Sequence, residues 1–163
     1  MKELDVSAVY IGVNLNIAVL PEILFFAFLD RLLKGRSISV MFMISAGAAV
    51  TRWTMLFLFP STPVFIFTQI FHSLTFVLTH YAFIRLIYEE LESKDIPAAQ
   101  GVYTPMGMGL STAILTFICG FLYDISPGSA FLGMAVVVIP CVVLGGWMYW
   151  KYDRVADGVY SNK

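Results

Sequence analysis

Long apolar stretches separated by short polar segments fill most of this chain. None of them shows the alternation of apolar and polar residues that is typical of a strand in a membrane barrel. About 20 residues, each rising about 1.5 Å, cross a hydrocarbon core about 30 Å thick, and every stretch has this length. The pattern predicts an all-α membrane protein with five transmembrane helices in a single domain. The predicted helices span residues 7–29, 40–59, 64–88, 101–122 and 130–150.

The composition supports a membrane location. Hydrophobic residues make up 59% of the 163 residues, charged residues make up 13%, and the mean hydropathy is +0.81. A soluble chain of this length could not bury so much apolar surface. The net charge of -1 and the lack of a basic cluster in the polar segments argue against a nucleic-acid partner. We expect a multi-pass protein of the cell membrane, inner or plasma, with the lipid bilayer as a partner.

The residue types needed for a metal site, a cofactor site or catalysis are not grouped in this sequence. Cys119 and Cys141 both lie in apolar stretches without metal-ligand spacing, so we interpret them as small apolar packing residues. The sequence has no serine–histidine pairing and no aspartate pair that would indicate an enzyme. We therefore predict no metal, no cofactor and no enzymatic activity.

Basic residues in short loops indicate the orientation of the helices. Eight of the ten lie on the side reached after the first, third and fifth predicted helices, which predicts an outward N-terminus and a cytoplasmic C-terminus. The connection at residues 89–100 carries several charges and is predicted to be a solvated cytoplasmic loop. The eight residues are Arg31, Lys34, Arg36, Arg85, Lys94, Lys151, Arg154 and Lys163.

Four ionisable residues lie inside the predicted helices: Glu22, Arg52, His72 and His80. A charge at the centre of a membrane helix costs about 2.5 to 3.5 kcal/mol, so such residues usually face a protein interior or a water-filled path. By their distance from the helix ends, Glu22 and His80 form an inner polar layer, and Arg52 and His72 an outer one. In low dielectric a carboxyl group or an imidazole can take up and release a proton near neutral pH, whereas arginine stays charged and suits an anion.

One face of the third predicted helix carries a polar and aromatic stripe. At about 100° per residue, Gln69, His72, Phe76 and His80 fall within an arc of about 80°. Such a stripe indicates a lining of a wet path. The structural alternatives stay open at this stage: each histidine can be a neutral, hydrogen-bonded residue of the bundle, Glu22 a paired acid, and Arg52 a member of an ion pair.

Several short motifs, taken in order, resemble the C-terminal half of a major facilitator superfamily transporter. The most similar branch is that of the phenylpropionate permeases, which are related to the lactose-permease-like proton symporters. The resemblance implies that the five helices correspond to helices eight to twelve of a twelve-helix protein, with an outward N-terminus. The motifs are Glu22-Ile23-Leu24-Phe25-Phe26, the segment 30–36 that starts with Asp30-Arg31, Arg52-Trp53, the segment 69–76 that starts with Gln69-Ile70-Phe71-His72, Thr79-His80, Gln100-Gly101-Val102-Tyr103 and Gly120-Phe121-Leu122-Tyr123.

The resemblance also implies site residues, with one departure from the pattern. His72 and Arg52 match a histidine and an arginine of the lactose-permease-like proteins. Gln69 and Thr75 stand where that group has a lysine and the proton-carrying glutamate, so Glu22 and His80 are the better proton candidates. The predicted substrate and proton pathway is formed by Glu22, Arg52, Gln69, His72, His80 and Tyr103.

The leading hypothesis is that the chain is part of a secondary active transporter, and is inactive as a fragment alone. It would be a symporter that uses the proton gradient to move a small organic solute, such as the aromatic acid 3-phenylpropionate. The alternative is a stand-alone membrane subunit that assembles with itself or with a separately encoded N-terminal half. The apparent mass of the tagged protein in its native cell distinguishes the two, because only the alternative expects a product near 18.2 kDa.

Overall fold

The computed structural model describes residues 22–25, 27, 28, 31, 33 and 35–153, with side chains up to residue 151. This part of the chain is helical, and four of its helices are long and apolar enough to cross a membrane. The prediction of an all-α membrane protein is therefore confirmed. The first predicted helix, at residues 7–29, lies mostly outside the described residues.

The four helices follow one another with short connections. Helix α2 spans Ile38–Leu58, α3 spans Thr62–Glu90 and α6 spans Pro127–Met148. The remaining span runs without a break from Ile96 to Ile125 through α4 (Ile96–Val102), a π-helical segment η2 (Tyr103–Leu110) and α5 (Ser111–Ile125). A second π-helical segment, η3 (Tyr149–Asp153), follows α6.

Local sequence explains where these helices start. Gly35 has a φ of +81°, which glycine adopts without strain, and the chain then turns into α2. The Ser37 hydroxyl accepts a hydrogen bond from the Val40 amide at 3.3 Å and caps that helix. Ser126 caps α6 in the same way through the Ser129 amide at 3.1 Å, and Pro127 is the first helical residue, a position that favours proline.

The connection between α3 and α4 is shorter than the predicted loop at residues 89–100. Helix α3 continues to Glu90, and α4 already begins at Ile96. Arg85 Nε donates to Glu89 Oε1 at 2.6 Å, an (i, i+4) pair that supports the last turn of α3. The polar residues of the sequence indicate where the chain leaves the membrane. A helix that is stabilised by such a pair can continue beyond that point.

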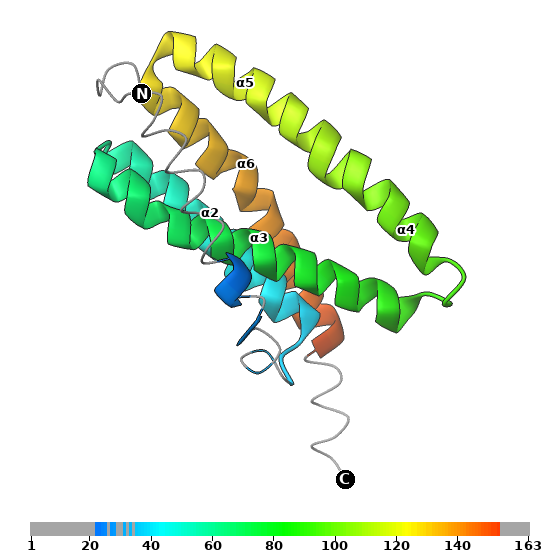
Figure 1. The fold of residues 1–163 in the computed structure, drawn as a ribbon. Helices are drawn as coiled ribbons and strands as arrows, with labels where there is room; N and C mark the ends of the chain where they lie inside the picture. Colours follow the sequence, from blue (N-terminus) through cyan, green and yellow to red (C-terminus); the bar gives the residue numbers. More distant parts are fainter. Residues whose placement is uncertain (1–21, 26, 29–30, 32, 34, 154–163) are drawn as a thin grey trace.

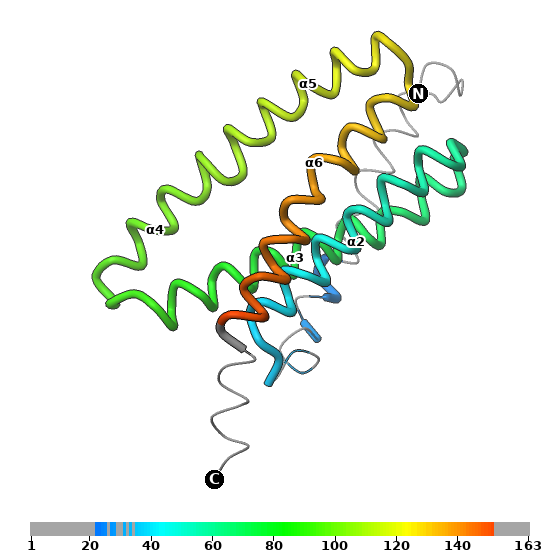
Figure 2. Tube along the Cα trace, turned by 180° about the vertical axis from the view of Figure 1, so that it is seen from behind, coloured from blue at the N-terminus to red at the C-terminus, as the bar shows by residue number. Residues whose placement is uncertain are grey.

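Helix α2 is the central element of the bundle. It packs along α3 on one side and along α6 on the other, while α5 packs against α6 and α4 approaches α3 (Figures 1 and 2). The Ser45 hydroxyl of α2 donates to the Thr75 carbonyl at 2.9 Å and lies 2.6 Å from the Thr79 hydroxyl, which links α2 to α3. The buried cluster between these helices contains Leu33, Met41, Val77, Leu78 and Ala82.

The ends of the helices agree with the predicted charge asymmetry. Successive spans run in opposite directions, so Arg36, Arg85 and Lys151 lie at the same end of the bundle (Figure 1). Arg85 Nη1 donates to the Arg36 carbonyl at 2.7 Å, which joins the start of α2 to the end of α3. The orientation with the N-terminus out and the C-terminus in stays a prediction.

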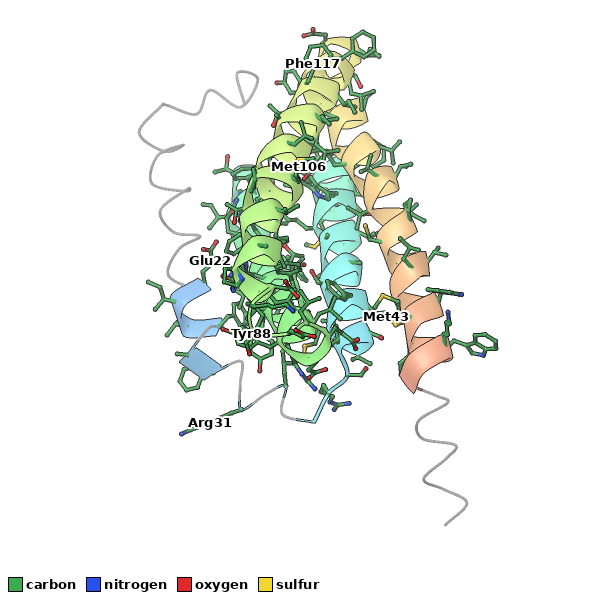
Figure 3. The ribbon with its side chains drawn as sticks, turned by 90° about the vertical axis from the view of Figure 1, so that its right-hand side faces the viewer. Glu22, Arg31, Met43, Tyr88, Met106 and Phe117 are labelled. Atoms are coloured by element: carbon green, nitrogen blue, oxygen red, sulfur yellow. The ribbon has the colours of Figure 1, made fainter. Side chains whose placement is uncertain are left out.

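The helix from Ile96 to Ile125 differs from the others because, after Ile96 in its first turn, its apolar surface is not buried. Neither η2 nor α5 contains a buried residue. Met106 is 56% exposed and Phe117 is 81% exposed, and Figure 3 labels both on this helix. The described residues therefore leave one long apolar helix face uncovered.

The close contact of α2 and α6 depends on a glycine. A Cβ added at Gly145 would lie 2.9 Å from Met43 Cγ and 3.4 Å from the Met43 backbone nitrogen, whereas nothing lies within 4 Å of a Cβ at Gly146. We expect Gly145→Leu to destabilise the bundle by about 1 to 3 kcal/mol because the larger side chain forces the helices apart. Thermal unfolding of the purified protein measures this effect. The adjacent Gly146→Leu is the control, and equal melting temperatures for both variants would contradict the packing described here.

Candidate solute-binding site

Arg52 and His72 lie in contact between α2 and α3. Arg52 Nη1 and His72 Nδ1 are 3.0 Å apart, and both side chains are half-buried. The guanidinium carbon also lies 4.7 Å from the ring centre of Trp53, within the range of a cation–π interaction. The sequence placed Arg52 and His72 at a similar depth, and the structure brings them together. Their roles in transport stay a prediction.

The charge of Arg52 is not neutralised by a carboxylate within the described part of the chain. The salt bridges there join Arg85 to Glu89 and Lys94 to Glu92. The Nε atom of Arg52 is buried and has no hydrogen-bond partner among the described residues. A guanidinium with an unused buried donor and a neighbouring imidazole can bind a planar anion such as a carboxylate.

Aromatic rings continue from this pair along α3 and on to η2. The rings of Phe76 and His80 are parallel, with centres 6.1 Å apart and an interplanar angle of 6°. The His80 ring lies 5.9 Å from Tyr103, which in turn stacks on Phe83 at 3.9 Å. Sequence reasoning singled out Tyr103 but missed Phe83. The signal for Phe83 was its spacing, since it follows His80 by three residues on the same helix face.

Segment η2 presents Tyr103 to α3. Pro105 lies within it and cannot donate a backbone hydrogen bond, and the Ser111 hydroxyl donates to the carbonyl groups of Met106 and Gly107. A Cβ at Gly107 would lie 3.0 Å from the Tyr103 ring. The glycine therefore gives the ring room to lie along its own helix. A π-helical segment is rare and frequently marks a functional position.

Gln69 occupies a different environment from its neighbours in the predicted stripe. It is only 5% exposed, and its Nε2 atom lies 3.5 Å from the Phe65 carbonyl of the same helix. His72, Phe76 and His80 are half-buried instead. Within the stripe, His72, Phe76 and His80 are thus more exposed than Gln69.

Glu22 lies on the short helical segment that precedes α2 (Figure 3). It is half-buried and shares a helix face with Phe25, which packs against the buried cluster of α2 and α3. Ile23 and Leu24 are 60% and 59% exposed. The carboxyl group is therefore on the bundle side of its helix. The predicted proximity of Glu22 to His80 stays a prediction.

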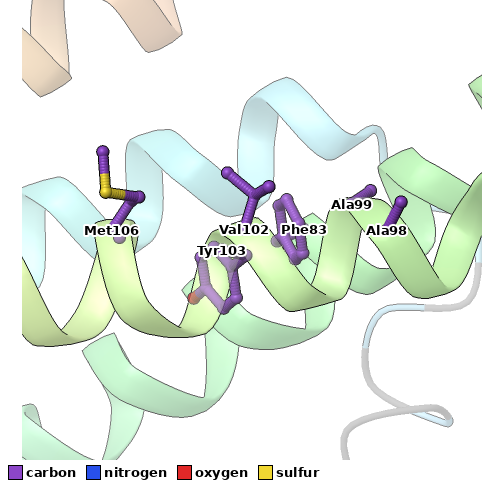
Figure 4. A pocket seen from close by; sticks show the side chains of 7 residues that line it. Phe83, Ala98, Ala99, Val102, Tyr103 and Met106 are labelled. Atoms are coloured by element: carbon purple, nitrogen blue, oxygen red, sulfur yellow. The ribbon is translucent and has the colours of Figure 1, made fainter.

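An apolar hollow of about 560 Å³ lies where α3 meets α4 and η2 (Figure 4). Phe83 is eleven residues from His72, which is about 16 Å along the helix axis. A small acid bound at Arg52 could not also reach this hollow. Its lining residues are Phe83, Ala98, Ala99, Val102, Tyr103, Met106 and Gly107.

Comparison with known families identifies the bundle. The family model described as the MFS_1 like family matches residues 1–133. The chain belongs to this family of the major facilitator superfamily. This confirms the resemblance found in the sequence and the prediction of a multi-pass, non-enzymatic membrane protein.

Among curated proteins, this MFS_1 like chain matches the "Probable 3-phenylpropionic acid transporter" of Escherichia coli strain K12. The two are 33% identical over 138 residues, which cover 85% of the chain. The chain spans 36% of the length of that relative. The comparison with solved structures gives no match.

Proposed function

We propose that the chain forms part of a proton-coupled symporter that moves a small aromatic carboxylic acid across the cell membrane. Two observations support an aromatic carboxylic acid as the solute. The relative named for 3-phenylpropionic acid is similar over most of the chain. The site itself offers a cation beside aromatic rings, the two features that an aromatic carboxylate requires.

The observation that carries this proposal is the state of Arg52. Its charge lies on a membrane-length helix, its Nε donor is buried without a partner among the described residues, and His72 is 3.0 Å from Nη1. A charge in this position is costly until an anion pairs with it. The carboxylate of the solute supplies that anion and accepts hydrogen bonds from the guanidinium.

Proton coupling is assigned to Glu22, with the two histidines as further proton-binding groups. Glu22 is half-buried and shares a helix face with Phe25, which packs against the buried cluster. If one proton enters with each carboxylate, the solute crosses the membrane without net charge movement.

The proposal predicts saturable uptake of labelled 3-phenylpropionate by cells that produce the full protein containing this chain. We expect uptake at pH 6.5 to be at least about threefold faster than uptake at pH 7.5, after subtraction of the signal from cells lacking the gene, because protons drive the symport. A protonophore should abolish the accumulation. Identical uptake with and without the gene would overturn the proposal.

We also propose that further membrane helices cover the exposed surface of η2 and α5 in the working transporter. Segment η2 and α5 have no buried residue, and the chain spans 36% of the length of its relative. The solute sites of such transporters lie between repeated bundles of helices. The additional helices belong either to the same polypeptide or to a partner subunit, and the mass of the tagged protein distinguishes these two cases.

A further inference from the structure

We propose that Phe76, His80 and Tyr103 form the surface that recognises the aromatic ring of the solute. The inference rests on the proposed function and extends it, because it names the residues that select an aromatic acid over an aliphatic one.

The three rings form a continuous surface on two helices. Phe76 and His80 stand parallel on α3, with centres 6.1 Å apart, and Tyr103 approaches His80 from η2 at 5.9 Å. All three are half-buried, so each keeps part of its ring available for contact. Aromatic rings prefer offset-stacked or edge-to-face contacts with centres about 4.5 to 7 Å apart, which a half-buried ring can offer to a ligand.

The distance from Arg52 fits a short aromatic acid. His72, which contacts Arg52, precedes Phe76 by four residues, or about 6 Å along the helix axis. In 3-phenylpropionate the two methylene groups hold the ring centre about 5 Å from the carboxyl carbon, as expected for three staggered bonds of about 1.5 Å and a ring radius of about 1.4 Å. A carboxylate on Arg52 therefore places the ring against Phe76 and His80. The apolar hollow beside Phe83 lies about 16 Å along α3 from His72, beyond the reach of the solute ring. Tyr103 lies between the two, since it lines the hollow and its ring is also 5.9 Å from that of His80.

Gly107 helps to position this surface. It leaves the space in which the Tyr103 ring lies, and Tyr103 is further held by its stack on Phe83 at 3.9 Å. The ring of Tyr103 is thus held by its stack on Phe83 and lies 5.9 Å from the ring of His80. Fixed rings lose little freedom on binding, which favours selectivity.

The test compares uptake of 3-phenylpropionate with that of 3-cyclohexylpropionate, which keeps the carboxylate and the chain but lacks the aromatic ring. In the full protein, we expect Phe76→Leu and Tyr103→Leu each to raise the KM for the aromatic acid about threefold to tenfold. The KM for the saturated acid should stay within about twofold of the wild-type value, because the loss concerns ring stacking alone.

Phe67→Leu is the matched control. It removes an aromatic ring from the same helix, but Phe67 is nine residues from Phe76, about half a turn around the axis, and is 51% exposed. Its KM values for both acids should equal those of the wild type. Testing Tyr103 on another helix guards against a folding defect, because Phe76 also packs against the buried cluster.

Two results would overturn the inference in distinguishable ways. If the wild type imports both acids and the two leucine variants change both KM values equally, the ring surface is wrong while the transport of carboxylates stands. If the wild type imports neither acid in a saturable manner, the proposed function fails and the inference fails with it.

Discussion

Arg52→Ala is expected to lower kcat/KM for saturable 3-phenylpropionate uptake by about a hundredfold. Removing one partner of a buried, hydrogen-bonded charge pair costs about 2 to 5 kcal/mol, and 2.7 kcal/mol corresponds to about a hundredfold. A loss of this size is expected because the Nε donor is buried and His72 adds a second polar group 3.0 Å from Nη1. Arg52→Lys should recover part of the activity, since it restores the charge but not the planar, forked donor.

Thr54→Val provides the control for this experiment. Thr54 lies two residues along α2 and is exposed, so its substitution changes the same helix without touching the Arg52–His72 pair. Its uptake should match the wild type within about twofold, as is usual for a surface substitution. Wild-type uptake by Arg52→Ala, at equal protein levels in the membrane, would remove Arg52 from the solute site.

Glu22→Gln is expected to abolish proton-driven accumulation of 3-phenylpropionate while exchange of internal for external solute continues. The amide keeps the size and the hydrogen-bonding capacity of the side chain but cannot bind and release a proton. Exchange needs only the loaded carrier, whereas net uptake requires the proton to leave on the inner side. Proteoliposomes with an imposed pH gradient measure proton-driven accumulation, and counterflow without a gradient measures exchange.

A second carboxylate of the chain serves as the control. Glu92 lies in the connection between α3 and α4, where its side chain is 73% exposed and pairs with Lys94 at 2.7 Å. Glu92→Gln should preserve both accumulation and exchange, because an exposed ion pair contributes little. Unchanged accumulation by Glu22→Gln, after subtraction of passive entry into empty vesicles, would exclude Glu22 as the proton carrier.

The sequence predicted the helical membrane fold because its apolar stretches are long enough to cross a bilayer and allow no other spanning form. It was less accurate at helix ends. The pair of Arg85 and Glu89 continues α3 past the apolar stretch, and α4 begins five residues before the predicted helix at residue 101. Hydropathy measures the transfer of side chains into lipid, whereas hydrogen bonds and capping decide where a helix ends.

The candidate site was predictable in its parts but not in its arrangement. An arginine and two histidines are visible as costly residues in apolar stretches, and helical periodicity placed His72, Phe76 and His80 on one face. The contact between Arg52 and His72 depends on how α2 packs against α3, and the stack of Phe83 on Tyr103 depends on the approach of α4 and η2. The rotation of each helix about its own axis, which decides both contacts, does not follow from a single sequence. Gln69 shows the same limit, since periodicity put it on the open face while packing buries it.

Direct binding to the purified full protein in lipid nanodiscs tests the carboxylate site most simply, because it avoids passive entry of a weak acid into vesicles. Labelled 3-phenylpropionate and its amide, 3-phenylpropionamide, would be compared on the wild type and on Arg52→Ala. We predict saturable binding of the acid by the wild type, at least about tenfold weaker binding of the uncharged amide, and the loss of acid binding in Arg52→Ala. Equal affinity of both proteins for the acid would contradict the assignment of Arg52 as the residue that binds the solute.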